Sequence, residues 1–177
     1  MGVEFHPQGA LLIIDMLNDF IDDGGSLVVP GARRIVPRVR QLLDAAREQG
    51  TAVVFVTDHH SEDDREFNYW PAHAVAGTWG AEVIPELAPL PGEHVVRKRR
   101  YSAFFGTDLD LYLREHGIRK LYLTGVLTNI CVYATALDAA MRLYQVAVFR
   151  DAVASLSEET DAFVFRQLAE VLQAELL

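Results

Sequence analysis

Residues 120–131 of this 177-residue chain, Lys120-Leu-Tyr-Leu-Thr-Gly-Val-Leu-Thr-Asn-Ile-Cys131, carry the clearest signal of its fold class. Residues 120–124 form a short apolar run with the length of a buried strand. Thr128 is a predicted N-cap, so a helix is expected to begin shortly after that strand. Residues 145–149 are predicted to form the next strand, and a strand-helix-strand unit builds a parallel sheet. The apolar stripe of the helix is expected to lie in the core, and it consists of Ile130, Ala134, Leu137, Met141 and Tyr144.

The same alternation of strands and helices is found on both sides of this stretch. Strands as apolar as these are usually covered on both faces of a sheet. We therefore predict a single domain over residues 1–177 with a three-layer α/β/α, Rossmann-like fold and a central, mostly parallel sheet. The other expected strands lie at residues 10–14, 52–56 and 94–98, and the other expected helices lie at about 35–46, 108–116 and 157–172.

The composition excludes several classes of partner. With a formal net charge of −9 the chain repels phosphate backbones and anionic surfaces, so neither nucleic acid nor a membrane is an expected partner. The apolar runs are far shorter than the roughly 20 residues of a membrane span. The single cysteine, Cys131, cannot form an intramolecular disulfide, and residues 1–7 lack the features of a signal peptide. A cytoplasmic location is expected.

Chemically useful side chains stand at the ends of the predicted strands. Asp15 comes directly after the first strand, Asp58 follows the second, Lys98 ends the third, and residues 125–131 form the turn after the fourth. Parallel strands present their carboxyl ends at one edge of a sheet, where ligands bind. We therefore expect these side chains to meet at one rim.

Cys131, Asp15 and Lys98 each have two interpretations. A lone cysteine is often a small buried residue, but the first turn of a helix stabilises a thiolate, which favours a nucleophile. Asp15 could serve as its acid or base, or it could cap the loop at residues 18–19. Lys98 lies in the run Arg97-Lys-Arg-Arg100, which is typical of a solvated face. Only one observation favours a functional Lys98. Successive side chains of a strand point to opposite faces, so Lys98 can point away from its charged neighbours.

A long segment after the second strand, residues 59–91, carries possible metal ligands. Asp58-x-His60 is followed by Glu66 and by Trp70-Pro-Ala-His73. Two imidazoles with one or two carboxylates suit Zn²⁺, Mn²⁺ or Fe²⁺ better than Ca²⁺ or Mg²⁺. Histidines and acids are also common on polar loops, so the residues alone leave both a metal site and an ordinary loop open.

Three motifs together resemble those of the isochorismatase-like cysteine hydrolases, over about residues 10–155. Ile14-Asp-Met-Leu-Asn-Asp-Phe20 resembles the opening I-D-x-Q-N-D-F, with Leu17 in place of the usual Gln. Lys98-Arg-Arg-Tyr-Ser-Ala-Phe-Phe-Gly-Thr107 is similar to the lysine segment, and Gly125-Val-Leu-Thr-Asn-Ile-Cys-Val132 to the nucleophile turn G-V-x-T-x-x-C-V. The resemblance implies a catalytic triad of Asp15, Lys98 and Cys131. It also implies a cis peptide between Val126 and Leu127, and an oxyanion hole made by the Leu127 and Cys131 amides.

The D-x-H and W-P-x-H motifs resemble those of the nicotinamidase (pyrazinamidase) branch. This resemblance implies a divalent transition metal, with Zn²⁺ expected first and Mn²⁺ or Fe²⁺ as alternatives, that holds the pyridine nitrogen of nicotinamide. Its implied ligands are Asp58, His60, Glu66 and His73. An aromatic slot for the substrate ring would be lined by Phe20, Trp70 and Tyr101.

The expected function is therefore hydrolysis of nicotinamide to nicotinate and ammonia through a thioester on Cys131. One alternative is another amidohydrolase of the superfamily, which acts on a carbamoyl, maleamate-like or ureido substrate without a functional metal. A second is a non-catalytic binding protein on the same fold, and the presence of Asp15, Lys98 and Cys131 together argues against it. The expected partner is a small-molecule amide. By analogy with the family, a homo-oligomer, either a dimer or a tetramer, is also expected.

Overall fold

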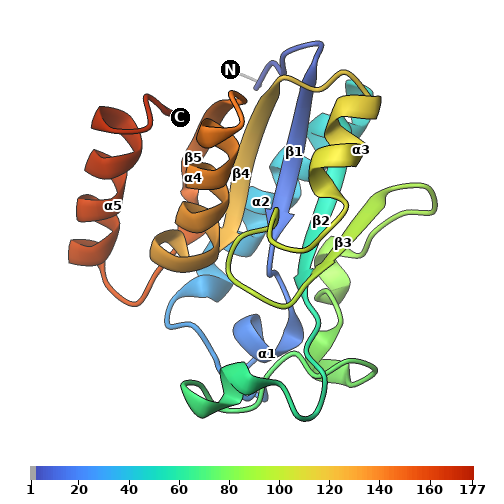
Figure 1. Cartoon of the computed structure of the whole chain (residues 1–177), viewed down its shortest axis with the longest axis vertical. Coiled ribbons are helices and arrows are strands. Elements are labelled where there is room, and N and C mark those ends of the chain that lie inside the picture. The colour runs from blue at the N-terminus through green and yellow to red at the C-terminus, as the bar shows by residue number, and fades with distance from the viewer. Residues whose placement is uncertain (1–2) are drawn as a thin grey trace.

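A computed structural model describes residues 3–177 of the chain (Figure 1). Six strands in this range form a sheet in the order β3-β2-β1-β4-β5-β6, and every strand pairing is parallel. The predicted α/β fold is confirmed, and its sheet is parallel throughout. The strands are β1 (Gly9–Ile14), β2 (Ala52–Asp58), β3 (His94–Lys98), β4 (Lys120–Val126), β5 (Gln145–Ala154) and β6 (Glu175–Leu176).

Helices cover both faces of the sheet and complete the three layers. In Figure 1, α2 (Val36–Glu48) lies behind the sheet, whereas α3 (Leu109–Glu115), α4 (Tyr133–Met141) and α5 (Glu158–Glu170) lie in front of it. None of the helices in residues 3–177 combines the length and the apolar character that a membrane span requires. The shorter helices are α1 (Asn18–Ile21), η1 (Ala32–Ile35), η2 (Arg65–Asn68), η3 (Trp79–Ala81), η4 (Pro85–Leu87) and η5 (Thr128–Val132).

The central strand β1 shows why this sequence needs layers on both sides. All six of its residues are buried, and successive side chains of a strand point to opposite faces. Leu11 and Ile13 pack in the core on the α2 side. Leu12 and Ile14 pack in the core formed with α3, α4 and α5. An apolar strand of this kind is stable only where both of its faces are covered.

The apolar stripe predicted for the helix that follows β4 is partly wrong. Met141 is 76% exposed and Leu137 is 40% exposed, whereas Tyr144 is buried as expected. The small residues of the buried face let α4 approach the sheet closely, and their i, i+3, i+4, i+7 spacing is as regular as that of the predicted stripe. The buried face consists of Val132, Thr135, Ala136 and Ala139.

The start of this helix also differs from the prediction. Thr128 is not the N-cap, because the cap position is Leu127 and no side chain caps the helix there. The first turn, η5, is a π-helix, in which the Leu127 carbonyl accepts hydrogen bonds from the Ile130 and Val132 amides at 3.1 Å each. Turns of this type are rare and are found frequently at functional sites.

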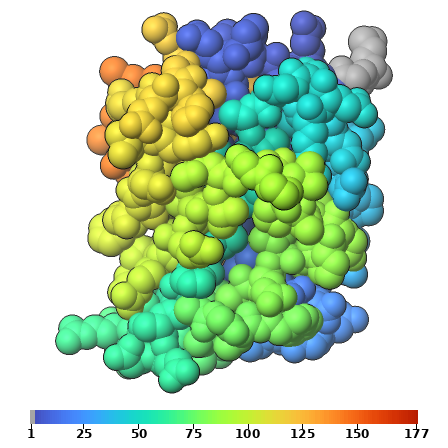
Figure 2. Space-filling model, turned by 90° about the vertical axis from the view of Figure 1, so that its right-hand side faces the viewer, coloured from blue at the N-terminus to red at the C-terminus, as the bar shows by residue number. Residues whose placement is uncertain are grey.

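The long segment between β2 and β3 covers the carboxyl ends of the strands. Figure 2 shows this segment in shades of green along the face beside β3 and at the lower end of the molecule. Its backbone is held in place at His60, which donates to the Ala74 carbonyl at 3.0 Å and accepts from the Ala76 amide at 2.8 Å. The segment therefore has a defined conformation and lies next to the carboxyl ends of the strands.

Candidate active site

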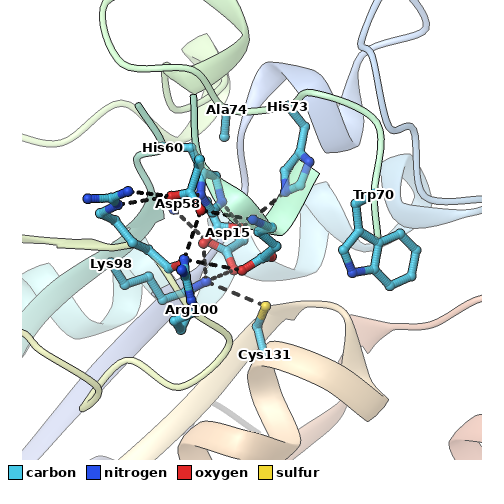
Figure 3. A network of polar contacts seen from close by, with 12 residues as sticks. Asp15, Asp58, His60, Trp70, His73, Ala74, Lys98, Arg100 and Cys131 are labelled. Carbon is cyan, nitrogen blue, oxygen red and sulfur yellow. Dashed lines mark hydrogen bonds and ion pairs between the residues drawn. The ribbon is translucent and has the colours of Figure 1, made fainter. Parts of the chain in front are cut away.

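The strand ends bring four side chains that are distant in sequence to one rim (Figure 3). Asp15 follows β1, Asp58 is the last residue of β2, Lys98 is the last residue of β3, and Cys131 lies in η5 after β4. Asp58 and Lys98 are register partners in adjacent parallel strands. All four side chains are buried, as the rim prediction requires.

Lys98 lies at the centre of this group. Its Nζ is 2.8 Å from Asp15 Oδ2, 2.5 Å from Asp58 Oδ1 and 3.5 Å from Cys131 Sγ. One ligand atom each from Asp15, Asp58 and Cys131 lie within 4.8 Å of one another. The lysine side chain has no exposed surface, so it compensates the charge of two carboxylates that are themselves removed from water. In the sequence, only the alternation of side chains along a strand favoured an inward-pointing Lys98. The structure agrees, because Lys98 is buried and its neighbour Arg97 is exposed.

The electrostatics of the group differ from those expected of a helix-stabilised thiolate. Burial raises the pKa of the Cys131 thiol well above its usual range, and the Lys98 charge only partly opposes this effect. Burial and the Asp58 carboxylate raise the pKa of Asp15 to about 6, although Lys98 lowers it. The Asp15 and Asp58 charges raise the pKa of Lys98, against the opposing effect of burial. The thiol is therefore protonated at rest, and a thiolate has to form by proton transfer to a neighbouring base.

Asp15 does not cap the loop at residues 18–19. Its Oδ1 accepts a hydrogen bond from the Asp58 amide at 2.8 Å, and its other carboxylate oxygen faces Lys98. Its backbone adopts a left-handed conformation, with φ of 53°, which is uncommon for residues other than glycine. The amide side chain of Asn18 bonds instead to the Trp79 carbonyl at 2.8 Å. The acid or base interpretation of Asp15 is the one that its surroundings favour.

The turn after β4, which leads to Cys131, has two unusual backbone features. The peptide between Val126 and Leu127 is cis, as the resemblance implied. Gly125 has φ of +108°, and a Cβ at this position would lie 1.9 Å from the Ile14 carbonyl oxygen, so only glycine lets β4 pass β1 here. Leu127 and Cys131 both line the largely apolar pocket described below.

A second cluster, made by Asp58, His60 and His73, lies beside the first. The ligand atoms of these three buried residues lie within 4.8 Å of one another. His60 Nε2 and His73 Nε2 are 3.7 and 3.8 Å from Asp58 Oδ2. The other ring nitrogen of each histidine is already bonded, His60 Nδ1 to Asp64 Oδ2 at 3.1 Å and His73 Nδ1 to the Pro71 carbonyl at 2.7 Å.

This arrangement fits a divalent transition metal. Because each Nδ1 faces an acceptor and carries the proton, each Nε2 presents a lone pair toward Asp58. His60 Nε2 is buried and has no hydrogen-bond partner among the described residues. Two imidazoles and a carboxylate that leave further positions for water or substrate form a donor set that suits Zn²⁺.

Glu66 is buried at the edge of this cluster but does not belong to its close group of three. Its nearest ion pair is with Arg100, at 3.6 Å. Burial and the Asp58 charge raise the pKa of Glu66, with His60 acting in the opposite direction. Its implied role as a fourth metal ligand stays a prediction.

A pocket of about 70 Å³ opens between the two clusters. Phe20, Trp70 and Tyr101 line it, as the resemblance implied, and the Trp70 indole nitrogen donates to the Tyr101 hydroxyl at 3.0 Å. Sequence reasoning missed its aliphatic wall, because four of the five residues come from segments without a chemical motif and the fifth, Ile130, was assigned to the core stripe of its helix. The aliphatic residues of the wall are Leu27, Val28, Val29, Ile130 and Leu156.

The fold and this rim define an α/β hydrolase. The Isochorismatase domain matches residues 9–175, so the chain belongs to the isochorismatase family. The pyrazinamidase/nicotinamidase of Streptococcus mutans UA159 is 38% identical with a TM-score of 0.91, and the match covers 96% of this chain and 99% of that chain. The pyrazinamidase of Pyrococcus horikoshii in complex with zinc is 34% identical with a TM-score of 0.89, covering 97% and 99%.

An amidase with a different substrate is also similar. The N-carbamoylsarcosine amidase of Thermoplasma acidophilum is 37% identical with a TM-score of 0.86, and the match covers 95% of this chain and 94% of that chain. The relatives therefore support an amidohydrolase of the isochorismatase family.

Proposed function

We propose that this protein is a nicotinamidase, which hydrolyses nicotinamide to nicotinate and ammonia. The observation that carries the proposal is the position of Cys131, within 3.5 Å of Lys98 Nζ and on the wall of a pocket that also contains Asp58 and His73. A nucleophile, a proton carrier and a site for a ring nitrogen are thereby close enough to act on one flat carboxamide. The similarity to the S. mutans pyrazinamidase/nicotinamidase supports this assignment.

The proposed reaction begins with proton transfer from the Cys131 thiol to Asp15. The sulfur attacks the carboxamide carbon, and the oxyanion is stabilised by the Leu127 and Cys131 amides. Asp15 then returns the proton to the departing nitrogen, so that ammonia leaves and a thioester remains on Cys131. Asp15 next removes a proton from water, and the resulting attack releases nicotinate and restores the thiol. Lys98 stabilises the negative charge that moves between Asp15 and Cys131 during these steps.

Asp58, His60 and His73 would hold the divalent metal, and the bound ion would supply a Lewis acid that anchors the pyridine nitrogen. Zn²⁺ is the first choice, because the donor set suits it and because the similar P. horikoshii pyrazinamidase is in complex with zinc. The aromatic rings of Phe20, Trp70 and Tyr101 would hold the substrate ring by stacking and edge contacts.

The shape and polarity of the pocket wall favour nicotinamide over a carbamoyl amino acid. Phe20, Trp70 and Tyr101 place aromatic rings on this wall, and most of the other residues that line it are aliphatic. N-carbamoylsarcosine is an aliphatic molecule, so it cannot stack on these rings as a pyridine ring can. Nicotinamide is neutral and aromatic, in keeping with the aromatic and aliphatic lining.

Ammonia release from purified protein tests the proposal. We expect turnover of nicotinamide and little turnover of N-carbamoylsarcosine at equal concentration. A chelator should abolish the activity, because the pyridine ring would lose the metal that anchors it. Added Zn²⁺ or Mn²⁺ should restore the activity. Turnover of the carbamoyl substrate without turnover of nicotinamide would contradict the proposal. Unimpaired nicotinamide hydrolysis after complete removal of metal would contradict the metal part alone.

A further inference from the structure

The proposed reaction makes no use of Asp64, a carboxylate in the segment between β2 and β3. Its side chain has no exposed surface, and each oxygen accepts more than one hydrogen bond. Asp64 Oδ2 accepts from His60 Nδ1 at 3.1 Å and from Arg99 Nε at 2.9 Å. Asp64 Oδ1 accepts from the Glu66 amide at 3.0 Å and from Arg100 Nη1 at 3.1 Å. A buried carboxylate that accepts this many hydrogen bonds holds its donors in fixed positions.

The contact with His60 decides which ring nitrogen can bind a metal. An ionised carboxylate only accepts hydrogen bonds, so its partner nitrogen, Nδ1, must carry the proton. The lone pair is then on Nε2, which faces Asp58 Oδ2 at 3.7 Å and has no hydrogen-bond partner among the described residues. Asp64 therefore fixes both the tautomer and the ring orientation of His60.

The same residue also positions the neighbouring short helix. Asp64 is the N-cap of η2, and its carbonyl accepts from the Phe67 amide at 3.1 Å. The Phe67 ring lies against His60 and His73, with ring centroids 5.4 and 5.6 Å apart. Removal of the cap would loosen the aromatic support of both imidazoles.

Two arginines connect Asp64 to the end of β3. Arg99 and Arg100 directly follow Lys98, and both guanidinium groups reach the Asp64 carboxylate. Arg99 Nη2 also donates to Ser61 Oγ at 3.1 Å. The run Arg97–Arg100 is typical of a solvated face, and the side chains of Arg99 and Arg100 are 57% and 41% exposed. Their guanidinium groups nevertheless connect Asp64 of the metal cluster to the end of the Lys98 strand.

We propose that Asp64, held by Arg99 and Arg100, is the positioning residue of the metal cluster and presets His60 Nε2 for the ion. The inference rests on the metal site of the proposed function. It does not require that nicotinamide is the substrate, because it concerns the affinity for metal.

The test compares Asp64→Asn with Asp63→Asn, an exposed neighbour that loses the same charge. Metal-free protein is titrated with Zn²⁺ against a competing chelator of known affinity. We expect Asp64→Asn to weaken Zn²⁺ binding by about 10- to 100-fold, the usual effect of losing such a partner, and Asp63→Asn to bind like the wild type. Equal affinity of Asp64→Asn and the wild type would overturn the proposal.

A second variant keeps the test decisive if Asp64→Asn does not fold. Arg99→Gln changes a side chain that is 57% exposed, and it removes one guanidinium from Asp64 without touching His60. We expect the metal-free variant to remain folded, as its circular dichroism spectrum would show, and to bind Zn²⁺ more weakly than the wild type. Wild-type Zn²⁺ affinity would overturn the role given to Arg99. Ring ¹⁵N spectra of the metal-free wild type, recorded at a pH at which His60 is neutral, should show the single ring proton on Nδ1, and a neutral ring with its proton on Nε2 would overturn the proposal. Zn²⁺ binding that depends on Asp64 in a protein that does not hydrolyse nicotinamide would contradict only the proposed function.

Discussion

At the scale of single residues, the site depends on Lys98. Its ammonium is buried between the Asp15 and Asp58 carboxylates and touches the Cys131 sulfur. A buried cation of this kind prevents two carboxylates from repelling each other, and it stabilises the anion that any proton transfer from the thiol creates. One side chain thus serves both the stability of the rim and the reaction proposed for it.

Replacement of Lys98 by Met should therefore damage both properties. The methionine would leave Asp15 and Asp58 buried without a cation, and we expect the free energy of unfolding to fall by about 3–5 kcal/mol. Ammonia release from nicotinamide should become undetectable. Urea denaturation and the amidase assay measure the two effects. The control is Arg97→Met, which removes an exposed charge from the adjacent position of β3 and should change neither quantity appreciably.

At this scale the sequence predicted much of the site. Asp15, Asp58, Lys98 and the turn with Cys131 could be placed at one rim because each follows a strand of a parallel sheet. The protonated state of the thiol could not be predicted, because the pKa of Cys131 depends on burial and on carboxylates brought from other strands.

At the scale of elements, one ion pair joins α2 to the approach to β3. Arg47, in the last turn of α2, donates from Nε to Glu93 Oε1 at 2.8 Å and from Nη2 to Glu93 Oε2 at 2.9 Å. The Leu90 amide donates to the same carboxylate at 2.7 Å. Both side chains are largely buried, at 18% and 13% exposure, so the pair should contribute more than an exposed one.

This pair predicts a pH-dependent stability difference. Burial alone would raise the pKa of Glu93, but the bonds from Arg47 and Leu90 lower it below its ordinary value of 4.5. The ionised form therefore stabilises the fold above pH 4.5, and this contribution is lost as the pH falls further. We expect Glu93→Gln to lower the free energy of unfolding by about 1–3 kcal/mol at pH 7, with the difference from wild type shrinking below pH 4.5.

Urea denaturation across this pH range measures the effect, with Glu86→Gln as the matched control. Glu86 pairs with Arg33 at 2.7 Å, but both side chains are about half exposed, so its loss should cost under about 1 kcal/mol. Equal effects of the two variants at pH 7 would contradict the role given to the Arg47–Glu93 pair.

Helices and strands could be predicted from the sequence where the apolar residues allowed a single interpretation. The strands at residues 10–14 and 52–56 are continuous apolar runs, and both were located correctly. The buried face of α4 was predicted wrongly because two apolar stripes share the helical period, and packing against the sheet favours the one with small residues. The two-residue strand β6 carries no periodic signal and was missed.

At the scale of the whole molecule, the parallel order of strands is what creates the site. The ends of β1, β2, β3 and β4 meet at one edge, and the segment between β2 and β3 adds the histidine cluster and part of the pocket wall. Motifs in the sequence predicted the side chains that meet at this edge, including Asp15, Lys98 and Cys131. The aliphatic wall and the Asp64 network could not be predicted, because both depend on side-chain contacts between segments that are distant in the sequence, such as that of Asp64 with Arg99.

Ammonia release from nicotinamide by Cys131→Ala is the decisive measurement for the proposed thioester mechanism. The activity should fall by on the order of 10³-fold or more, because no other group at the rim can form the thioester. The circular dichroism spectrum and the Zn²⁺ affinity should remain those of the wild type, since Cys131 is outside the histidine cluster. If Cys131→Ala released ammonia from nicotinamide at the wild-type rate, Cys131 would not be the nucleophile.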